Sequence, residues 1–359
     1  MTMRAVASAH FSEENHLKYM YDWHCQHHPA MEPQDVVKLY FQAMMGCGHL
    51  LGEESYVTQR IIEEETKLSP SQTEPLLEPL GPSYVRLNLR RAMAEKITPQ
   101  QIARLMKLSQ PERLPERSTV VEALKADANP AVYAAAQRLV LEPNWLPNHT
   151  PAYHAAYSPA YRVISRKCAA VLPVLKALSN SEEKDRLLLC IDGPCGSGKS
   201  TLAAILQNVL GAALIPMDDF FLPHPRKTAE RLAQPGGNAD WERLRDEFLH
   251  PWQRDGYASY HPYDCQANNY GEAISVPQRR VTIIEGSYSM MPDIRKHADL
   301  CIFLQVSAEE QQRRILGRNG PKMLQMFNER WIPLEQNYFK AFQLPDQSCL
   351  VISQDLQFV

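Results

Sequence analysis

The stretch IDGPCGSGKST, from Ile191 to Thr201, decides the fold of this chain. An apolar run, Leu187 to Ile191, precedes it, and a helix-forming run, Leu202 to Val209, follows it. Its glycines permit backbone conformations that other residues avoid, so that successive N–H groups can converge on one point. A lysine and two hydroxyl groups stand behind them in fixed order. This order indicates a polyanion that is held by backbone.

The stretch fits the P-loop pattern G-x-x-x-x-G-K-[ST], because it follows a predicted strand and opens a predicted helix. In that pattern the lysine, Lys199, reaches the β and γ phosphates, and the serine, Ser200, is a ligand of Mg²⁺. The positive end of the helix points at the same place. An ordinary glycine turn is the alternative, but it would not require all four motif positions. We therefore predict that ATP and Mg²⁺ bind here, at Gly193, Pro194, Cys195, Gly196, Ser197, Gly198, Lys199, Ser200 and Thr201.

Length and composition set the frame for this motif. The chain has 359 residues, of which 44% are hydrophobic and 22% charged, which is typical of a globular protein with about two domains. Its net charge is −3 and no run of Lys and Arg exceeds three residues, so neither nucleic acid nor a membrane is an expected partner. The 8 cysteines form no C-x-x-C pair, which fits reduced thiols. With no signal sequence and no long apolar run, we expect a cytoplasmic protein.

The first half of the chain shows helical spacing of apolar residues, and we predict a mostly α-helical domain over residues 1–178. A short strand, Tyr84 to Leu89, is expected inside it, and Thr98 followed by Pro99 marks a helix start. The polar segment Leu178 to Arg186 is the predicted linker. The predicted helices are Pro33 to Leu51, Glu53 to Leu68, Thr98 to Ser109, about Val120 to Val140, and Ala160 to Leu178.

The second half, residues 179–359, has a different pattern of short apolar runs bounded by Gly, Pro, Asp or Ser. Runs that alternate with helical segments and are apolar on both faces are typical of a parallel sheet. We therefore predict a three-layer α/β domain of the P-loop NTPase class. The five runs are Arg186 to Gly193, Ala212 to Asp218, Arg280 to Gly286, Asp299 to Val306 and Cys349 to Gln354.

Acidic residues follow two of these strands, where ligands of open α/β sheets bind. Asp218 and Asp219 follow the second run, and Glu285 ends the third. Beside a phosphate site, they indicate a cluster that binds Mg²⁺ and accepts a proton. We assign Asp218 as the base, with Asp219 as the alternative, and Glu285 as a metal ligand, either directly or through water. Taken singly, each acid could also be a solvated loop start.

Five segments resemble the uridine kinase and phosphoribulokinase-like group of P-loop kinases. They are GPCGSGKST, MDDFFLP, VTIIEGSYSM, ADLCIFLQVSAEEQQRRI and WIPLEQNYF, and the resemblance covers about Arg186 to Val359. It implies a five-stranded parallel sheet with flanking helices. It also implies that Asp218 is the catalytic acid and Glu285 the acid associated with the metal.

Members of this family close an arginine-bearing lid over the phosphates. Arg313, Arg314 and Arg318 resemble that lid, and the last two would share a helix face at a spacing of four residues. Guanidinium groups there would neutralise charge on the transferred phosphoryl group. We assign Arg314 and Arg318 to catalysis with Lys199, and Arg313 to nucleotide binding. An exposed helix of this charge could instead be merely solvated.

The acceptor side resembles the family less. Tyr263 and Asp264 match a Tyr-Asp segment of the uridine kinases, but no arginine lies between Asp264 and Gln278, so uridine is not favoured. We expect Asp219, Phe221, Tyr263 and Asp264 to bind the acceptor. Aromatic residues of this region, Phe220, Phe221, His224, Trp241 and Tyr263, could line a pocket or belong to the core.

Two further groups invite a functional hypothesis. His24, Cys25, His27 and His28 lie close enough to bind zinc, although a surface histidine cluster is the more common explanation. Cys195 lies inside the loop at a helix start, where positive potential would lower its pKa.

The residues leave three functions to compare. A kinase would transfer the γ-phosphoryl group of ATP to a hydroxyl of a nucleoside-, sugar- or vitamin-like metabolite. An ATP-gated switch would pass its state from the P-loop half to a partner through the helical half. A phosphate hydrolase would need a water-orienting residue that the sequence does not reveal. The first half could shape the acceptor site, form a homodimer or bind a second ligand.

Overall fold

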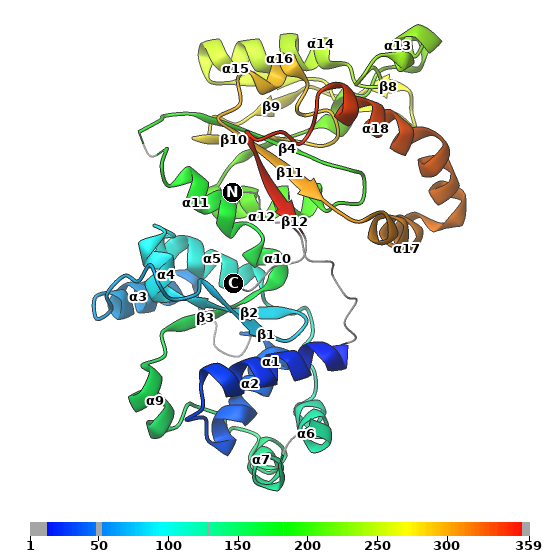
Figure 1. Cartoon of the computed structure of the whole chain (residues 1–359). Coiled ribbons are helices and arrows are strands. Elements are labelled where there is room, and N and C mark those ends of the chain that lie inside the picture. Colours follow the sequence, from blue (N-terminus) through cyan, green and yellow to red (C-terminus); the bar gives the residue numbers. More distant parts are fainter. Residues whose placement is uncertain (1–12, 48–51, 128, 182, 354–359) are drawn as a thin grey trace. The chain divides into compact units, whose positions relative to one another are not determined.

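The computed structural model describes residues 13–47, 52–127, 129–181 and 183–353. The described residues up to Ser179 form one compact unit, and those from Asn180 onward form another (Figure 1). The two units are described separately.

The second unit is built on a parallel sheet of five strands in the order β12-β11-β4-β10-β5. Each strand occupies one of the five predicted apolar runs, so the predicted sheet is confirmed. Leu187 to Ile191 of the central strand are fully buried, as expected for a strand covered on both faces. The strands are β4 (Leu187–Asp192), β5 (Ala213–Pro216), β10 (Val281–Glu285), β11 (Leu300–Gln305) and β12 (Cys349–Ser353).

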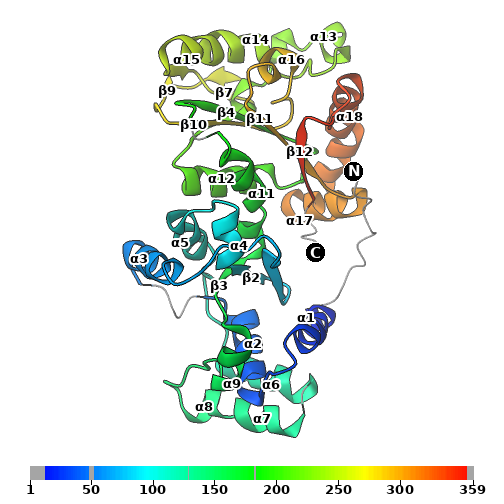
Figure 2. The same ribbon diagram turned by 60° about the vertical axis from the view of Figure 1, so that its left-hand side comes forward.

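Helices cover both faces of this sheet, which makes three layers (Figure 2). Alternate residues of β4 face opposite sides, so Leu188 and Cys190 join a core with Leu244, Phe248 and Trp252. Helix α12 lies on the other side of the sheet in both views. The main helical segments are α12 (Lys199–Leu210), the consecutive α14 (Trp241–Arg243), η3 (Leu244–Leu249) and α15 (His250–Asp255), and the consecutive α17 (Ala308–Met326), η4 (Phe327–Trp331) and α18 (Ile332–Ala341).

Short elements complete this unit around the sheet. Two antiparallel pairs, β6 with β9 and β7 with β8, follow α15 along the chain. These elements are η1 (Met217–Phe220), η2 (His224–Arg226), α13 (Ala229–Ala233), β6 (Ala258–Tyr260), β7 (Tyr263–Asp264), β8 (Asn269–Tyr270), β9 (Ile274–Val276) and α16 (Pro292–Arg295).

The first unit is mostly helical, as predicted, and surrounds a small antiparallel sheet in the order β1-β2-β3. The predicted strand is β2, and Thr98 caps α5 by accepting a hydrogen bond from the Gln101 N–H. The strands are β1 (Leu77–Leu80), β2 (Tyr84–Asn88) and β3 (Tyr161–Ser165). The helices are α1 (Glu13–His27), α2 (Pro33–Met45), α3 (Glu54–Glu65), α4 (Leu89–Ala94), α5 (Pro99–Leu108), α6 (Arg117–Asp127), α7 (Pro130–Ala136), α8 (Arg138–Leu141), α9 (Pro151–Tyr157), α10 (Arg166–Ala169) and α11 (Leu172–Leu178).

Two predicted helices are wrong in this unit. The segment from Ala160 begins with β3, because Val163 and Ile164 pair with β2 and β-branched residues suit a sheet. Helix starts at Ser165, whose side chain accepts a hydrogen bond from the Cys168 N–H. The predicted helix from Val120 is interrupted, since Asn129 caps a new helix, α7, that begins at Pro130. Residues 48–51 of the first predicted helix, and Gln354 of the last predicted strand, lie outside the described residues.

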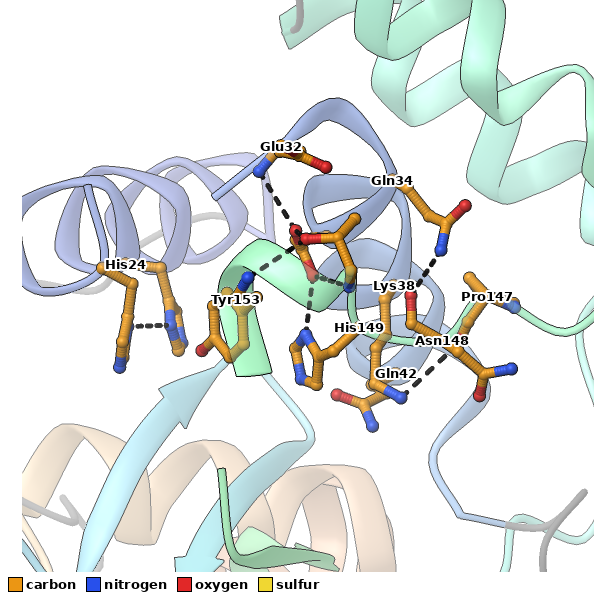
Figure 3. A network of polar contacts seen from close by, with 12 residues as sticks. His24, Glu32, Gln34, Lys38, Gln42, Pro147, Asn148, His149 and Tyr153 are labelled. Carbon is orange, nitrogen blue, oxygen red and sulfur yellow. Dashed lines mark hydrogen bonds and ion pairs between the residues drawn. The ribbon is translucent and has the colours of Figure 1, made fainter. Parts of the chain in front are cut away.

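A buried polar network joins α2 to the loop before α9 (Figure 3). It reaches β3 through Tyr161. The Asp35 carboxylate, fully buried, accepts hydrogen bonds from His149 Nδ1 at 2.8 Å and from the N–H and hydroxyl of Thr150. Burial by itself raises the pKa of Asp35, but these hydrogen bonds outweigh it and lower that pKa to about 2. On the other side of the ring, His149 Nε2 lies 2.7 Å from the Tyr161 hydroxyl.

The network continues to a buried arginine. Gln42 Oε1 accepts hydrogen bonds from Arg86 Nε at 3.2 Å and Nη2 at 2.9 Å, and Arg86 stacks on the Tyr161 ring. Glu78 lies 3.8 Å from Arg86 and supplies a counter-charge. Buried polar groups need such partners, so the network fixes how α2 packs against β2 and β3.

Candidate active site

The glycine-rich stretch forms a tight loop between β4 and α12, at the carboxyl edge of the sheet. Gly193, Gly196 and Gly198 have positive φ angles of 141°, 74° and 95°. A Cβ atom on Gly193 would lie 2.4 Å from the backbone oxygen of Leu304, so only glycine fits beside β11. The loop therefore has the strand-loop-helix geometry that holds phosphates in P-loop proteins.

Lys199 lies buried over this loop at the first position of α12, with 7% of its surface exposed. Its Nζ atom donates hydrogen bonds to the backbone oxygens of Gly193 at 2.7 Å and Pro194 at 3.0 Å. Carbonyl oxygens accept hydrogen bonds from the ammonium group without pairing with its charge, which lowers the pKa of nearby Asp192, Asp218 and Glu285 against the effect of burial. The loop thus presents a fixed positive charge beside its N–H groups.

Ser200 and Glu285 bring two oxygen ligands together next to Lys199. Glu285 ends β10, whose register places it opposite Ile191 of β4, and the Ser200 hydroxyl donates to Glu285 Oε1 at 3.1 Å. Burial raises the pKa of Glu285, while Lys199 acts in the opposite direction. A hydroxyl and a carboxylate oxygen are the ligands that Mg²⁺ prefers, so this pair fits the metal. Thr201, the second hydroxyl, is exposed on α12.

The two aspartates after β5 have different surroundings, although they are neighbours in η1. Tyr260 donates a hydrogen bond from its hydroxyl to Asp219 Oδ2 at 2.8 Å. Asp218 is reachable from solvent and has no hydrogen-bond partner among the described residues. The surrounding protein nevertheless restricts its hydration and raises its pKa, against the attraction of Lys199 and Arg318. Asp218 is therefore the more accessible of the two carboxylates.

The three predicted lid arginines lie on α17 and have separate contacts. Arg314 Nη1 donates to the backbone oxygen of Gly196 at 3.1 Å, so this side chain touches the loop. Arg318 bonds to Asn319 but is close enough to Asp218 to lower its pKa. Arg313 is 69% exposed and pairs with Glu310. Arg314 thus contacts the loop, Arg318 acts on Asp218 through its charge, and Arg313 pairs with Glu310 instead.

Two acids at the site were not singled out from the sequence. Asp192, at the end of β4, is fully buried and accepts hydrogen bonds from the Gly193 N–H at 2.7 Å and the Tyr338 hydroxyl at 2.8 Å. Burial raises its pKa to about 6. Asp192 ends a predicted strand one residue before the motif. The same pattern singled out Glu285 and could have identified Asp192 from the sequence.

Glu335 of α18 is the second acid. Its carboxylate accepts hydrogen bonds from the Cys195 N–H at 2.9 Å and from the Ser287 hydroxyl at 2.5 Å. Gln311 of α17 donates to the backbone oxygen of Cys195 at 2.8 Å. The helices that follow β11 are therefore bonded directly to the outer turn of the loop, and no sequence motif indicated this contact.

The expected low pKa of the Cys195 thiol is wrong. Burial and the Glu335 carboxylate raise the pKa of Cys195 to about 12. Both effects disfavour a thiolate, and they exceed the attraction of Lys199. The raised pKa favours the protonated thiol at Cys195.

The predicted acceptor residues are spread over the region beyond Asp219. Phe221 is half-buried and pairs through its backbone with Ala239. Tyr263 is buried, with its hydroxyl on Asn268 at 2.6 Å, and Asp264 is exposed and accepts the N–H groups of the turn that follows it. The strand β7, which carries Tyr263 and Asp264, packs against η1, but in the described part of the chain none of these side chains is hydrogen-bonded to Asp218.

Asp240 and Arg226 also border the η1 turn. The backbone N–H of Asp240 donates to the Phe220 oxygen at 2.7 Å, and the fully buried Asp240 carboxylate pairs with Arg226 at 2.5 Å. Phe220 is core and Trp241 is half-buried, while His224 is exposed.

The N-terminal histidines serve packing rather than a metal site. His24 is buried, with Nε2 at 2.9 Å from the Pro79 oxygen, and His27 stacks on the Trp23 ring. Cys25 is exposed. In the part of the chain that the structure describes, no group of three His, Cys, Asp or Glu side chains is arranged to hold a metal ion.

These observations define the second unit as a P-loop α/β domain. No family model matches the chain, and no curated protein does. Among solved structures it is similar to one described as a possible uridine kinase from Bacillus stearothermophilus, with 20% identity and a TM-score of 0.41. The match covers 51% of this chain and 97% of that one.

A second solved structure, described as a putative fructose transport system kinase from Silicibacter sp. TM1040, has 26% identity and a TM-score of 0.39. This match covers 50% of this chain and 95% of the chain in that structure. Both matches extend over about half of the chain. Within the described residues, no helix combines the length and apolar character needed to cross a membrane.

Proposed function

We propose that this chain is an ATP-dependent kinase that transfers a phosphoryl group to a hydroxyl of a small metabolite, of nucleoside, sugar or vitamin type. The observation that carries the proposal is the meeting of three elements at one edge of the sheet. These are the glycine loop with Lys199, the Ser200–Glu285 oxygen pair, and an acid, Asp218, that has no hydrogen-bond partner among the described residues.

Each residue has a defined task in such a transfer. The N–H groups of the loop and Lys199 hold the phosphates of ATP, and Arg314 and Arg318 neutralise charge on the transferred group. Ser200 and Glu285 would hold Mg²⁺, which, when bound, neutralises charge on the phosphate oxygens. Asp218 accepts the proton of the acceptor hydroxyl at a carboxylate oxygen. Its raised pKa suits a base, because a stronger base takes the proton more readily.

The test is a transfer assay with the purified full chain, Mg²⁺ and γ-labelled ATP, against a panel of nucleosides, sugars and vitamins. We expect one acceptor class to become labelled. The Asp218→Asn variant should lose roughly 10²–10⁴-fold in kcat because a positioned base contributes that much. Asp246→Asn is the matched control, since Asp246 is exposed and pairs with Arg245 outside the site. Full transfer by Asp218→Asn would reject Asp218 as the base.

An ATP-gated switch is the competing function, and the separate core of the first unit is the feature that favours it. A sensor has no need of an acid available to take a proton, so Asp218 counts against it. The two are separated by one result. ATP-dependent capture of a partner protein, without labelling of any acceptor in the panel, would replace the kinase proposal.

A further inference from the structure

A cleft of about 450 Å³ lies at the opposite edge of the sheet from the phosphate loop. Arg186 immediately precedes β4, and Arg279 and Arg280 immediately precede β10, so the cleft lies at the amino ends of these strands. Gly256, which follows α15, closes another side. All its lining residues belong to the second unit.

The cleft has an excess of positive charge. Four arginines and two aspartates line it. Asp255 is already paired with Arg254 at 2.6 Å, and Asp185 is exposed. In the part of the chain that the structure describes, no carboxylate forms an ion pair with Arg186, Arg279 or Arg280. Their charges therefore remain to be compensated.

Backbone carbonyls hold two of these guanidinium groups in place. Arg186 donates to the oxygens of Trp252 at 2.6 Å and Gln253 at 3.2 Å, and it lies 5.5 Å from the centre of the Trp252 ring. Arg280 donates to the oxygens of Lys184 at 3.2 Å and Ser181 at 2.7 Å. Carbonyls orient a guanidinium group without cancelling its charge, so little side-chain entropy is left to lose when an anion binds.

Gly256 allows the donors to approach one another. Its φ angle is 77°, and a Cβ atom there would lie 3.0 Å from Arg186 Nη1 and 3.2 Å from Gln278 Nε2. The Gln278 side chain has no hydrogen-bond partner in the described part of the chain. An amide donor and several guanidinium groups thus surround one hollow that any larger residue at position 256 would narrow.

We propose that this cleft binds a small polyanion, a metabolite that carries phosphate or two carboxylates. Fixed, uncompensated guanidinium groups recognise such oxygens through paired hydrogen bonds. The site is separate from the phosphate loop, because the length of β4 between them corresponds to roughly 20 Å. The proposal does not depend on kinase activity.

Trp252 provides a local signal for the test, because its ring lies against Arg186. We titrate the full chain with pyrophosphate at constant ionic strength and without metal ions, and follow tryptophan fluorescence. The expected result is a saturable change that is absent from Trp252→Phe. Arg279→Glu should weaken it at least tenfold, while Arg245→Glu, with the same change of charge outside the cleft, should leave it unchanged.

Calorimetry separates this site from the loop. The parent chain should bind two equivalents of pyrophosphate and Arg279→Glu one, with unchanged thermal unfolding as the check on folding. Malonate is the second probe. If both malonate and pyrophosphate bind at the cleft, the ligand can carry either two carboxylates or phosphate. If pyrophosphate binds and malonate does not, the ligand carries phosphate. An unchanged affinity and an unchanged number of bound pyrophosphate equivalents in Arg279→Glu would overturn the proposal.

Discussion

The glycine-rich loop with its neighbouring acids and the Asp35 network of the first unit are both polar clusters. They differ in whether every polar side chain has a hydrogen-bond partner. Asp35 accepts bonds from His149, Thr150 and the Glu32 N–H, and each of these partners is fixed in turn. At the loop, Asp218 has no hydrogen-bond partner among the described residues, and Lys199 Nζ donates its hydrogen bonds to backbone carbonyls rather than to a carboxylate. A network in which every group is hydrogen-bonded stabilises a fold, whereas a polar group without a partner can bind a ligand or take part in a reaction.

The largest expected effect on the free energy of unfolding comes from removing the carboxylate that accepts the hydrogen bonds of the Asp35 network. Asp35→Ala leaves the buried donors of His149 and Thr150 without an acceptor, which should cost roughly 3 kcal/mol, or about a hundredfold in the folding equilibrium of the first unit. Denaturant unfolding measures this change. Asp22→Ala is the control, because the Asp22 carboxylate is exposed and pairs with Lys18 on the surface of α1. Equal stability of the two variants would show that the network is not needed for the fold.

Acid should weaken the same network. Burial lowers the pKa of His149 to about 4, so the folded unit keeps this ring neutral while the unfolded chain takes up a proton near pH 6.5. Stability from His149 is therefore complete above pH 6.5 and declines as the pH falls to 4, by roughly 2 kcal/mol at pH 4.5.

Asp35, with its pKa of about 2, loses its contribution in the same direction but below pH 4. Unfolding curves at pH 7 and 4.5 measure the His149 effect. His149→Gln should show a flatter dependence between these values, and an equally steep dependence would assign it to other groups.

Glu335 combines the two situations. Both of its carboxylate oxygens accept hydrogen bonds, as in the Asp35 network, but it lies against the glycine-rich loop. Glu335→Gln keeps the shape but cannot accept both the Cys195 N–H and the Ser287 hydroxyl in the same way. Because one hydrogen bond to a charged group contributes about 1.5 kcal/mol, we expect the KM for ATP to rise up to tenfold with a smaller change in kcat. Steady-state kinetics measures both. A fall in kcat alone would mean that Glu335 acts on the reaction rather than on the loop.

The sequence predicted those features that depend on neighbouring residues. The loop glycines, the five buried strands and the Thr98 cap of α5 follow from local patterns, and the structure contains them. The helix predicted from Ala160 failed because β3 is stabilised by its pairing with β2, some 80 residues earlier in the chain. Local propensity does not report such a partner.

The pKa of Cys195 illustrates the same limit at the site. A helix start predicts a low value, but Glu335 lies 140 residues away in sequence and bonds to its backbone N–H. That distant carboxylate, with burial, reverses the sign of the shift.

What the sequence by itself determined is the phosphate loop and the order of strands and helices that follows it, because glycine conformations and apolar periodicity act over a few residues. Only the tertiary structure decided which of Asp218 and Asp219 stays available, which arginines reach the loop, and where the arginine cleft lies. Charge, burial and hydrogen bonding depend on distances in space, and those are set by packing between segments that are remote in the chain.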